Sequence, residues 1–595
     1  MANLTRGGQV WHHHLRMLSL VFGKTFWWVL AAWLTVISFT IPAYLDRWDN
    51  YIVIKFAACY LKSEILKGGD HVAPFEYPDG RIVDARVGTV ANNPWVRDQV
   101  KRVGYEIGHA IFWPTVGLVI AIIVLFKIYY KTGSRLVKDE HMRGVSLVDE
   151  NTLNTLVPKY RNPFTLANVR LPDKSWYQHL LVVGGTGTRK SRVLFELLDC
   201  IRQRGDRAIV HSSSPEFLSH YYRDGTDVLM NPLDARSVYW DPWAEITHEI
   251  DGIGMAEALI PPTQSDNPIW YLAPRSLVAS MFGKVAKDPD IGHFLRMLVT
   301  SETAELKEYL KGTEAYGYLS KAEENEDRGM GQSIKTFATN AVKGFRLLQK
   351  PMGRDPFVIR DWIANDHDDA CIFMSAQGAH TSLLRPLFTL WIHQAIEGIL
   401  MLPDSYERRI WVIADELDTL HQFEAWPRFM SESRKKGGCA VSAFQSPSQL
   451  QQRWGIPGAK ILTGGCATWM NLRLNEPSEA KWASEGIGQR ERLERSENIG
   501  FGAHEIRDGV NLSENQKVAL SILGSQIMNL DDGHGFLRVR GNFPIAEVEI
   551  PYKARREHHE QFVPVDMENT FWDSLKEEEI EEGTGDFVRE VLDRG

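Results

Sequence analysis

The stretch that most constrains this chain is a short apolar run followed by a glycine-rich turn and a lysine–serine pair. Leu180–Val183 has the length of a buried strand, and the apolar periodicity of Ser191–Arg202 predicts a helix. Between them lie Gly184, Gly185, Thr186, Gly187, Thr188, Arg189 and Lys190. In such a unit the loop N–H groups surround phosphates, the lysine reaches the β- and γ-phosphates, and the serine hydroxyl binds Mg²⁺. We therefore predict that residues 184–191 bind the phosphates of a nucleotide, helped by the dipole of the helix N-terminus.

Arg189 departs from the phosphate-binding pattern G-x-x-x-x-G-K-[ST]. Gly184 occupies the first glycine position, but Arg189 stands where the second glycine is expected, directly before Lys190. Because glycine lets the backbone approach a ligand without a Cβ, Arg189 could crowd the phosphates or place a cation beside them. The alternative interpretation is a glycine-rich turn that binds no nucleotide.

Length and composition limit the remaining possibilities. A chain of 595 residues is too long for one hydrophobic core and predicts about three or four domains. The net charge of −9, with both signs well mixed, excludes a basic coat over the whole protein, so any contact with nucleic acid must be local. The five cysteines are scattered without a CxxC motif, which indicates reduced thiols rather than a disulfide framework or metal site.

Two uncharged segments predict a membrane anchor. Residues 25–45 carry no charge over a length that crosses a hydrocarbon core of about 30 Å, and residues 109–130 hold a second uncharged run. Basic residues flank the outer side of both, which places residues 1–24 and the rest of the chain in the cytoplasm and residues 46–108 outside. A cleaved signal peptide or two buried core helices are the alternatives, but the first run is too long and both are rich in aromatic residues.

The rest of the chain indicates an α/β domain interrupted by helices. Residues 131–178 form a polar connector. Residues 179–250 and 350–554 contain short apolar runs typical of buried parallel strands. Residues 251–349 show only helical periodicity and predict an all-helical insertion, although these helices could instead belong to the α/β layer. Residues 555–595 are acidic, and we expect a tail outside the core.

Two further predicted strands end in residues suited to phosphoryl transfer. Ile410–Ala414 is followed by Asp415 and Glu416, and the next strand ends at Gln445. Because functional groups gather at the carboxyl ends of parallel strands, we expect these side chains near the glycine loop. Asp415 would bind Mg²⁺ with Ser191, Glu416 would orient or activate water, and Gln445 would sense the γ-phosphate. An acidic pair that merely caps the next helix is the alternative.

These motifs, in this order, resemble those of type IV secretion coupling proteins of the TraD/TrwB kind, the membrane-anchored conjugation ATPases. The segments that carry the resemblance are Arg204–Ile209, Asn231–Arg236, Trp240–Trp243, Leu384–Leu387, Ala414–Leu417, Ser433–Gly438, Phe444–Gln449 and Ile506–Val510. The two N-terminal spans and the helical insertion are also similar, so the resemblance covers nearly the whole chain.

The resemblance implies a RecA-like P-loop NTPase domain, of the α/β class, that assembles as a homohexameric ring at the bacterial inner membrane, with residues 46–108 in the periplasm. It implies ATP and Mg²⁺ as cofactors, single-stranded DNA as substrate, and a relaxase–DNA complex and secretion-channel proteins as partners. Arg385 would reach the γ-phosphate of a neighbouring subunit, or form a structural ion pair at a helix start. Lys335, Lys343 and Arg346 would contact DNA or form a solvated face, and Arg434–Lys436 would track DNA phosphates.

Two departures leave other hypotheses open. Arg189 is one; the other is His211–Ser214 after the second strand, where similar proteins carry an Asp or a Lys. A hydrolysis-impaired membrane receptor that docks DNA-processing proteins is therefore the second hypothesis. A segregation translocase of the FtsK type shares the fold but normally has more membrane spans and a DNA-reading terminal domain, neither of which this chain shows.

Overall fold

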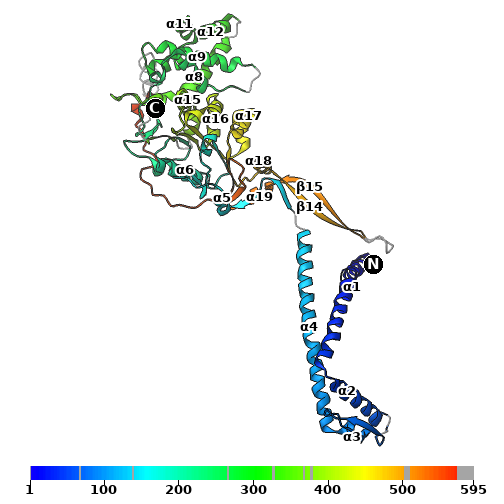
Figure 1. Cartoon of the computed structure of the whole chain (residues 1–595). Helices are drawn as coiled ribbons and strands as arrows, with labels where there is room; N and C mark the ends of the chain where they lie inside the picture. Colours follow the sequence, from blue (N-terminus) through cyan, green and yellow to red (C-terminus); the bar gives the residue numbers. More distant parts are fainter. Residues whose placement is uncertain are drawn as a thin grey trace, which may run out of the picture. The chain divides into compact units, whose positions relative to one another are not determined.

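The computed structural model describes residues 2–65, 67, 69–136, 140–263, 267–324, 328–365, 369–375, 380–500 and 509–571. These residues divide into two compact units (Figure 1). One comprises residues 1–139 with 494–515, and the other comprises residues 140–493 with 516–595.

The first unit contains two long helices, α1 (Ala2–Tyr44) and α4 (Pro94–Leu136). The segments Thr25–Tyr44 and Pro94–Lys131 are long and apolar enough to cross a bilayer. The helix that holds the second span begins at Pro94, earlier than the predicted boundary at residue 109. Polar contacts join the two helices, since Trp33 Nε1 donates to Thr115 Oγ1 at 3.3 Å.

The segment between these helices folds around a small core of its own. Its elements are α2 (Arg47–Tyr60), a π-helical turn (Leu61–Ile65), β1 (Val72–Glu76), β2 (Ile82–Arg86) and α3 (Val87–Asn92). The strands β1 and β2 pair antiparallel, and Ile52, Phe75 and Val103 are buried in the core. The sequence indicated no element here, although α2 is 14 residues long; the strands and α3 are too short to show a period.

The second unit is built on a ten-stranded sheet in the order β4-β17-β16-β13-β7-β12-β11-β8-β10-β9. The strands are β4 (Leu147–Asp149), β7 (Leu180–Val183), β8 (Arg207–Ser212), β9 (Val228–Leu229), β10 (Cys371–Ser375), β11 (Ile410–Ala414), β12 (Gly438–Phe444), β13 (Thr468–Leu472), β16 (His534–Arg538) and β17 (Ile545–Glu549). From β13 to β9 all neighbours are parallel, whereas β16 is antiparallel to β13 and to β17. The central strands are buried on both faces, as parallel sheets require.

Helices cover both faces of this sheet and create two hydrophobic clusters. In β11, Ile410 and Val412 belong to one cluster, while Trp411 and Ile413 belong to the other, as the alternation of strand side chains requires. Helices on the first face are α15 (Thr381–Met401), α16 (Ala425–Glu432), α17 (Pro447–Gly464), α18 (Pro477–Ile487) and α19 (Gly524–Met528). The second face carries α5 (Glu150–Leu156), α6 (Lys190–Arg204) and α7 (Glu216–Tyr221).

A run of helices interrupts the sheet between β9 and β10. They are α8 (Glu249–Leu259), α9 (Ile269–Val285), α10 (Ile291–Val299), α11 (Thr303–Tyr309), α12 (Glu314–Glu324), α13 (Arg328–Val342), a 3-10 turn (Lys343–Leu347) and α14 (Ile359–Ala364). Stacked Phe282, Phe294 and Phe345 lie in a core that continues into the sheet's own. The α/β class with an all-helical insertion is thus confirmed, and the described part of residues 249–347 contains no strand.

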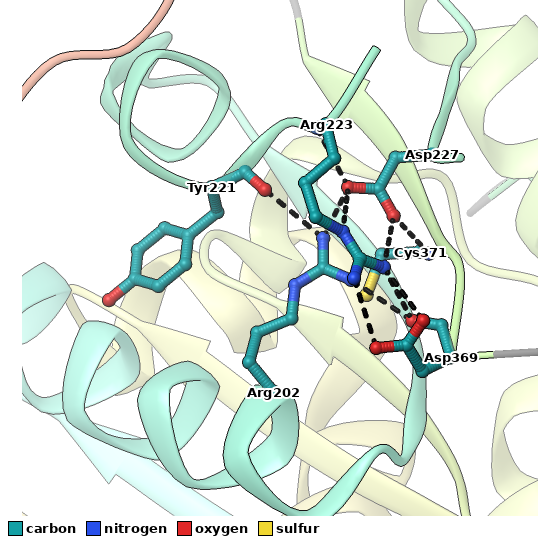
Figure 2. Close-up of polar contacts among 6 residues, drawn as sticks. All are labelled: Arg202, Tyr221, Arg223, Asp227, Asp369 and Cys371. Atoms are coloured by element: carbon teal, nitrogen blue, oxygen red, sulfur yellow. Dashed lines mark hydrogen bonds and ion pairs between the residues drawn. The ribbon is translucent and has the colours of Figure 1, made fainter. Parts of the chain in front are cut away.

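A charged cluster holds the end of α6, the helix that follows the glycine loop, against the sheet (Figure 2). Arg202, in the last turn of α6, donates to the Asp227 carboxylate and to the Asp369 backbone oxygen. Arg223 forms ion pairs with both Asp227 and Asp369, at 3.2 and 3.0 Å. Asp227 also accepts the Cys371 N–H at 2.8 Å, at the first residue of β10. Asp227 and Asp369 therefore join the end of α6, the loop before β9 and the start of β10. This cluster lies at the amino ends of the parallel strands, whereas the glycine loop lies at their carboxyl ends.

The chain beyond residue 555 differs from the predicted acidic tail. Residues 555–571 pack along the second unit, where Arg555 pairs with Asp199 of α6, and Ala235 N–H donates to Val563 O at 2.8 Å. Farther on, Lys350 N–H donates to Asn569 O at 2.8 Å, which ties the segment to the end of the helical insertion. The acidic run 577–582 lies outside the described residues.

The sequence also gave no sign of three paired strands. These are β3 (Glu140–Gly144), β14 (Gln489–Gly500) and β15 (Gly509–Leu520), in the order β15-β14-β3. A two-stranded sheet joins β5 (Thr165–Leu166) to β6 (Val169–Arg170). Of the long strands, β14 is rich in charged residues and β15 in uncharged polar ones, so they show little of the apolar alternation by which a half-buried strand is found.

Candidate functional site

The glycine loop occupies the gap between β7, which ends at Val183, and α6, which begins at Lys190. A Cβ on Gly184 would lie 2.6 Å from the Leu472 side chain and 2.7 Å from Thr188 Oγ1, so only glycine fits there. The Thr188 hydroxyl donates to Gly185 O at 2.7 Å and closes the loop on itself. The backbone is therefore held in a tight turn at the carboxyl end of the parallel strands.

Arg189 adopts the left-handed conformation, with φ of 70° and ψ of 28°. This backbone geometry explains why the pattern favours glycine at this position, since other residues rarely adopt it. The side chain lies against Gly533, where an added Cβ would come within 2.6 Å of Arg189 Nη1. Gly533 precedes β16, which lies on the opposite side of β7 from β12 and β11. Arg189 thus extends away from Asp415 and Gln445 instead of crowding the space between these strand ends.

Lys190 and Asp415 meet at the strand ends, as the sequence had predicted. Lys190 is 8% exposed, and its Nζ donates to Asp415 O at 2.9 Å and lies 3.8 Å from Asp415 Oδ1. Asp415 Oδ2 accepts the Ser212 hydroxyl at 3.0 Å, whereas the buried Oδ1 has no hydrogen-bond partner among the described residues. Burial raises the pKa of Asp415, and the charge of Lys190 opposes this. A carboxylate oxygen without a hydrogen-bond partner, near the lysine that precedes Ser191 in the first turn of α6, is a ligand suited to a hard cation.

Glu416 and Gln445 belong to a continuous hydrogen-bonded chain. Gln445 Nε2 donates to Glu416 Oε1 at 2.8 Å, and Gln445 Oε1 accepts the Thr186 hydroxyl at 3.0 Å. The other carboxylate oxygen of Glu416 accepts the Ser213 hydroxyl. The chain thus joins the ends of β8, β11 and β12 to the glycine loop.

The serines after β8 support both acids, a role that sequence reasoning missed. Ser212 holds Asp415 and Ser213 holds Glu416, while Ser214 N–H donates to Ser212 Oγ at 3.0 Å. The signal was present as three successive hydroxyl residues at the end of a buried strand. What the sequence could not show is that β8 and β11 are neighbours in register, with His211 opposite Ala414.

His211 is buried at the end of β8 beside these serines. Its Nε2 lies 2.9 Å from the Thr419 hydroxyl, and burial lowers its pKa to about 4. The ring also packs on Phe388, with the two ring centroids 5.2 Å apart. This histidine is neutral at physiological pH and helps to hold the turn that follows Glu416.

The remaining basic candidates have different surroundings. Arg385, in the first turns of α15, donates from Nε to Thr419 O at 2.7 Å, so it contacts the turn after its own Glu416 rather than a carboxylate. Arg434 is exposed in the 3-10 turn Ser433–Lys436, which precedes β12. It therefore lies at the amino end of that strand, whereas Asp415 and Gln445 lie at the carboxyl ends of their strands. Lys335 is 6% exposed and donates to Ser301 O, so neither of the two roles predicted for it, a DNA contact or part of a solvated face, is correct.

Comparisons with known proteins agree on one family. The family model described as the type IV secretion-system coupling protein DNA-binding domain matches residues 163–551. The coupling protein TraD of Escherichia coli K12 is 29% identical over 466 residues, which cover 76% of this chain and 64% of TraD. The chain therefore matches less than two thirds of the length of TraD.

The same similarity appears in solved structures. The unbound conjugative coupling protein TrwBdeltaN70 gives a TM-score of 0.65 at 25% identity, covering 72% of this chain and 97% of TrwB. TrwB structures with the GTP analogue GDPNP and with ADP and Mg²⁺ each give a TM-score of 0.64 at 25% identity, again over 72% of this chain and over 98% and 97% of theirs. The predicted RecA-like fold is confirmed by these matches. The family model spans more than half of the chain, over the sheet, the helical insertion and the glycine loop, and the chain belongs to the type IV secretion-system coupling proteins.

Proposed function

We propose that this chain is a membrane-anchored ATPase that couples ATP hydrolysis to the transfer of single-stranded DNA in a conjugative secretion system. The observation that carries the proposal is the chain of hydrogen bonds from Ser213 through Glu416 and Gln445 to Thr186, beside a buried Lys190–Asp415 pair. A structural cap for a helix would need only one of these groups. Their convergence on one edge of the sheet fits phosphoryl transfer, which needs positioning and charge stabilisation.

The residues present fit ATP and Mg²⁺. The amides of loop 184–189 and the Lys190 ammonium would hold the phosphates, and Lys190 would exchange its contact with Asp415 O for a phosphate oxygen. Ser191 and the unsatisfied Asp415 Oδ1 would hold Mg²⁺, which neutralises charge on the phosphate oxygens when bound. TrwB, 25% identical to this chain, is known in complex with ADP and Mg²⁺.

Glu416 is the residue that would orient the attacking water. Its two carboxylate oxygens are held by Ser213 and Gln445, so the side chain has a fixed direction. Gln445 also contacts Thr186 of the glycine loop, which lets it respond to an occupied γ-phosphate position. The bond from Arg385 to its own Thr419 does not favour a role in a neighbour's site, and reaching one would require that bond to break.

The assembly and partners follow from the family rather than from a contact in this chain. We propose a homohexamer in the bacterial inner membrane, anchored by two spans within α1 and α4, with residues 46–108 in the periplasm and the termini and motor in the cytoplasm. Relaxase-bound DNA and the secretion channel would be its partners. TraD is named a coupling protein and TrwB a bacterial conjugative coupling protein, which supports this assignment.

The test is an ATPase assay on the full chain in detergent, with and without single-stranded DNA at two salt concentrations. We expect DNA to stimulate hydrolysis, and we expect Lys190→Ala and Glu416→Gln to lower the rate by about 100-fold or more. Glu308→Gln, an exposed carboxylate paired with Lys311, is the matched control and should behave as wild type. Equal rates in wild type and both site variants would refute the motor and leave a docking platform that binds partners without nucleotide.

A further inference from the structure

A cavity of about 320 Å³ lies next to the turn that follows the Asp415–Glu416 pair. Its lining residues come from the loop after α8, from the segment after Thr419 and from the kink in α17: Pro261, Pro262, Thr263, His421, Gln422, Gln452, Arg453 and Gly455. Gly455 has φ of 68° and ψ of 164° and divides α17 into two helical segments. The first segment ends and the second begins at the cavity, so the ends of the two helix dipoles oppose each other there.

Two arginines hold successive carbonyls of the turn beside the cavity, and of these Arg453 lines it. Arg453 Nε donates to Asp418 O at 3.3 Å, and Arg385 Nε donates to Thr419 O at 2.7 Å. Within the described part of the chain, neither guanidinium forms an ion pair with a carboxylate. Each arginine is therefore fixed through one nitrogen, and its charge is not neutralised by a bonded acid.

The electrostatics of the neighbouring groups agree with a positive site. Burial and then the charges of Arg385 and Arg453 lower the pKa of His421 to about 3, so this histidine is neutral. The pKa of Arg385 is lowered by burial and by Arg453, with Asp418 acting in the opposite direction. Two cations facing one nearby carboxylate leave a net positive charge beside a cavity large enough for a phosphate group.

We propose that this cavity binds a phosphate of the single-stranded DNA backbone and couples DNA occupancy to the catalytic carboxylate. The inference rests on the proposed function, since it names a DNA contact of that motor. Guanidinium groups suit phosphate oxygens because their planar donors form paired, charge-assisted hydrogen bonds. Glutamine and neutral histidine side chains supply further donors without adding an acid.

The coupling has a defined path. The Thr419 hydroxyl donates to Glu416 O at 2.6 Å and lies 2.9 Å from His211 Nε2. A phosphate that draws Arg453 from Asp418 O would release one restraint on the turn 417–419 and change how Glu416 is presented. Hydrolysis would then depend on DNA although the cavity and the nucleotide loop bind different phosphates.

The DNA contact is tested without nucleotide, by the affinity of the full chain in detergent for a fluorescent single-stranded oligonucleotide across a range of salt. Arg453→Gln should weaken binding several-fold at low salt and reduce the slope of log affinity against log salt by about 0.7. The deficit should then shrink about 2.5-fold between 50 and 200 mM salt. Arg428→Gln removes the same charge beside another cavity, where Arg428 pairs with Glu397 at 2.9 Å, and should match wild type. If the slopes of Arg453→Gln and Arg428→Gln both equal that of wild type, the cavity is not a DNA site.

The source of the phosphate and the coupling are tested separately. If Arg453→Gln weakens binding of a fluorescent ATP analogue but leaves the DNA affinity unchanged, the cavity holds a nucleotide phosphate and the DNA assignment is wrong.

Thr419→Val should keep the DNA affinity of wild type and lose most of the DNA stimulation of ATPase. Full stimulation in Thr419→Val would refute the path. A wild-type protein without ATPase activity would refute the proposed function, while the binding slopes would still decide the DNA site.

Discussion

Replacing Asp227 with asparagine should lower the stability of the nucleotide-binding unit without touching the candidate site. Asp227 is 6% exposed, and its two oxygens accept hydrogen bonds from Arg202, Arg223 and the Cys371 N–H (Figure 2). An amide of the same shape can accept at only one end, and its NH₂ would face donors at the other. It would also leave Asp369 as the only acid of the cluster to balance two guanidinium groups. Removing one partner of a buried ionic cluster costs about 3–5 kcal/mol.

Thermal unfolding of the full chain in detergent, followed by tryptophan fluorescence, measures this loss. A unit of this size shifts by roughly 1 °C per kcal/mol, so the midpoint should fall by about 3–5 °C. Glu308→Gln makes the same chemical change in an exposed pair, where the Glu308 side chain is 70% exposed, and should shift the midpoint by less than about 1 °C. If the two variants melt together within 1 °C of wild type, the cluster does not carry the energy assigned to it.

Three further changes test other parts of the structure. Arg189→Gly should leave the affinity for an ATP analogue within about two-fold of wild type, because the residue already has a glycine-like φ of 70° and points to Gly533; a ten-fold change in fluorescence titration would contradict this. Lys335→Met should leave DNA affinity unchanged, because Lys335 is buried. It should not lower the stability, since the substitution removes a buried cation. Weaker DNA binding would show that Lys335 contacts DNA after all. Burial lowers the pKa of His393, in α15, to about 4, below the ordinary value near 6.5. Its contribution to folding stability is therefore full above pH 6.5 and is lost as the pH falls toward 4. The advantage of wild type over His393→Gln in denaturant unfolding should therefore drop by about 2 kcal/mol between pH 7 and pH 5, and a constant difference would refute the assignment.

Much of the architecture follows from local pattern. The strand Leu180–Val183 and the strand Ile410–Ala414 have the bounds expected of them, because buried parallel strands appear as uninterrupted apolar runs between polar turns. Most helices of the insertion are also visible from their periodicity, whereas α12 is not among those predicted. The strands that local pattern does not reveal are short, as β9 is, or polar, as β14 and β15 are, and β9 and β14 pair with strands distant in the chain.

The arrangement of the site required the fold. Lys190, Asp415 and Gln445 were identifiable from the residues that precede them, since each stands at the end of an apolar strand or at the start of a helix. That Ser212 and Ser213 hold the two acids, and that Arg189 lies against Gly533, depends on which strands are neighbours.

Sequence alone determined which residues can form strands, helices and phosphate-binding turns in this protein, because these are properties of neighbouring residues. Only the tertiary structure decided the partners of those residues, because β8 lies beside β11 and β7 lies between β12 and β13 through crossings of the chain that no local signal records. The positive cavity at Arg453 and the packing of residues 555–571 belong to the second kind, since both depend on contacts between residues far apart in the chain.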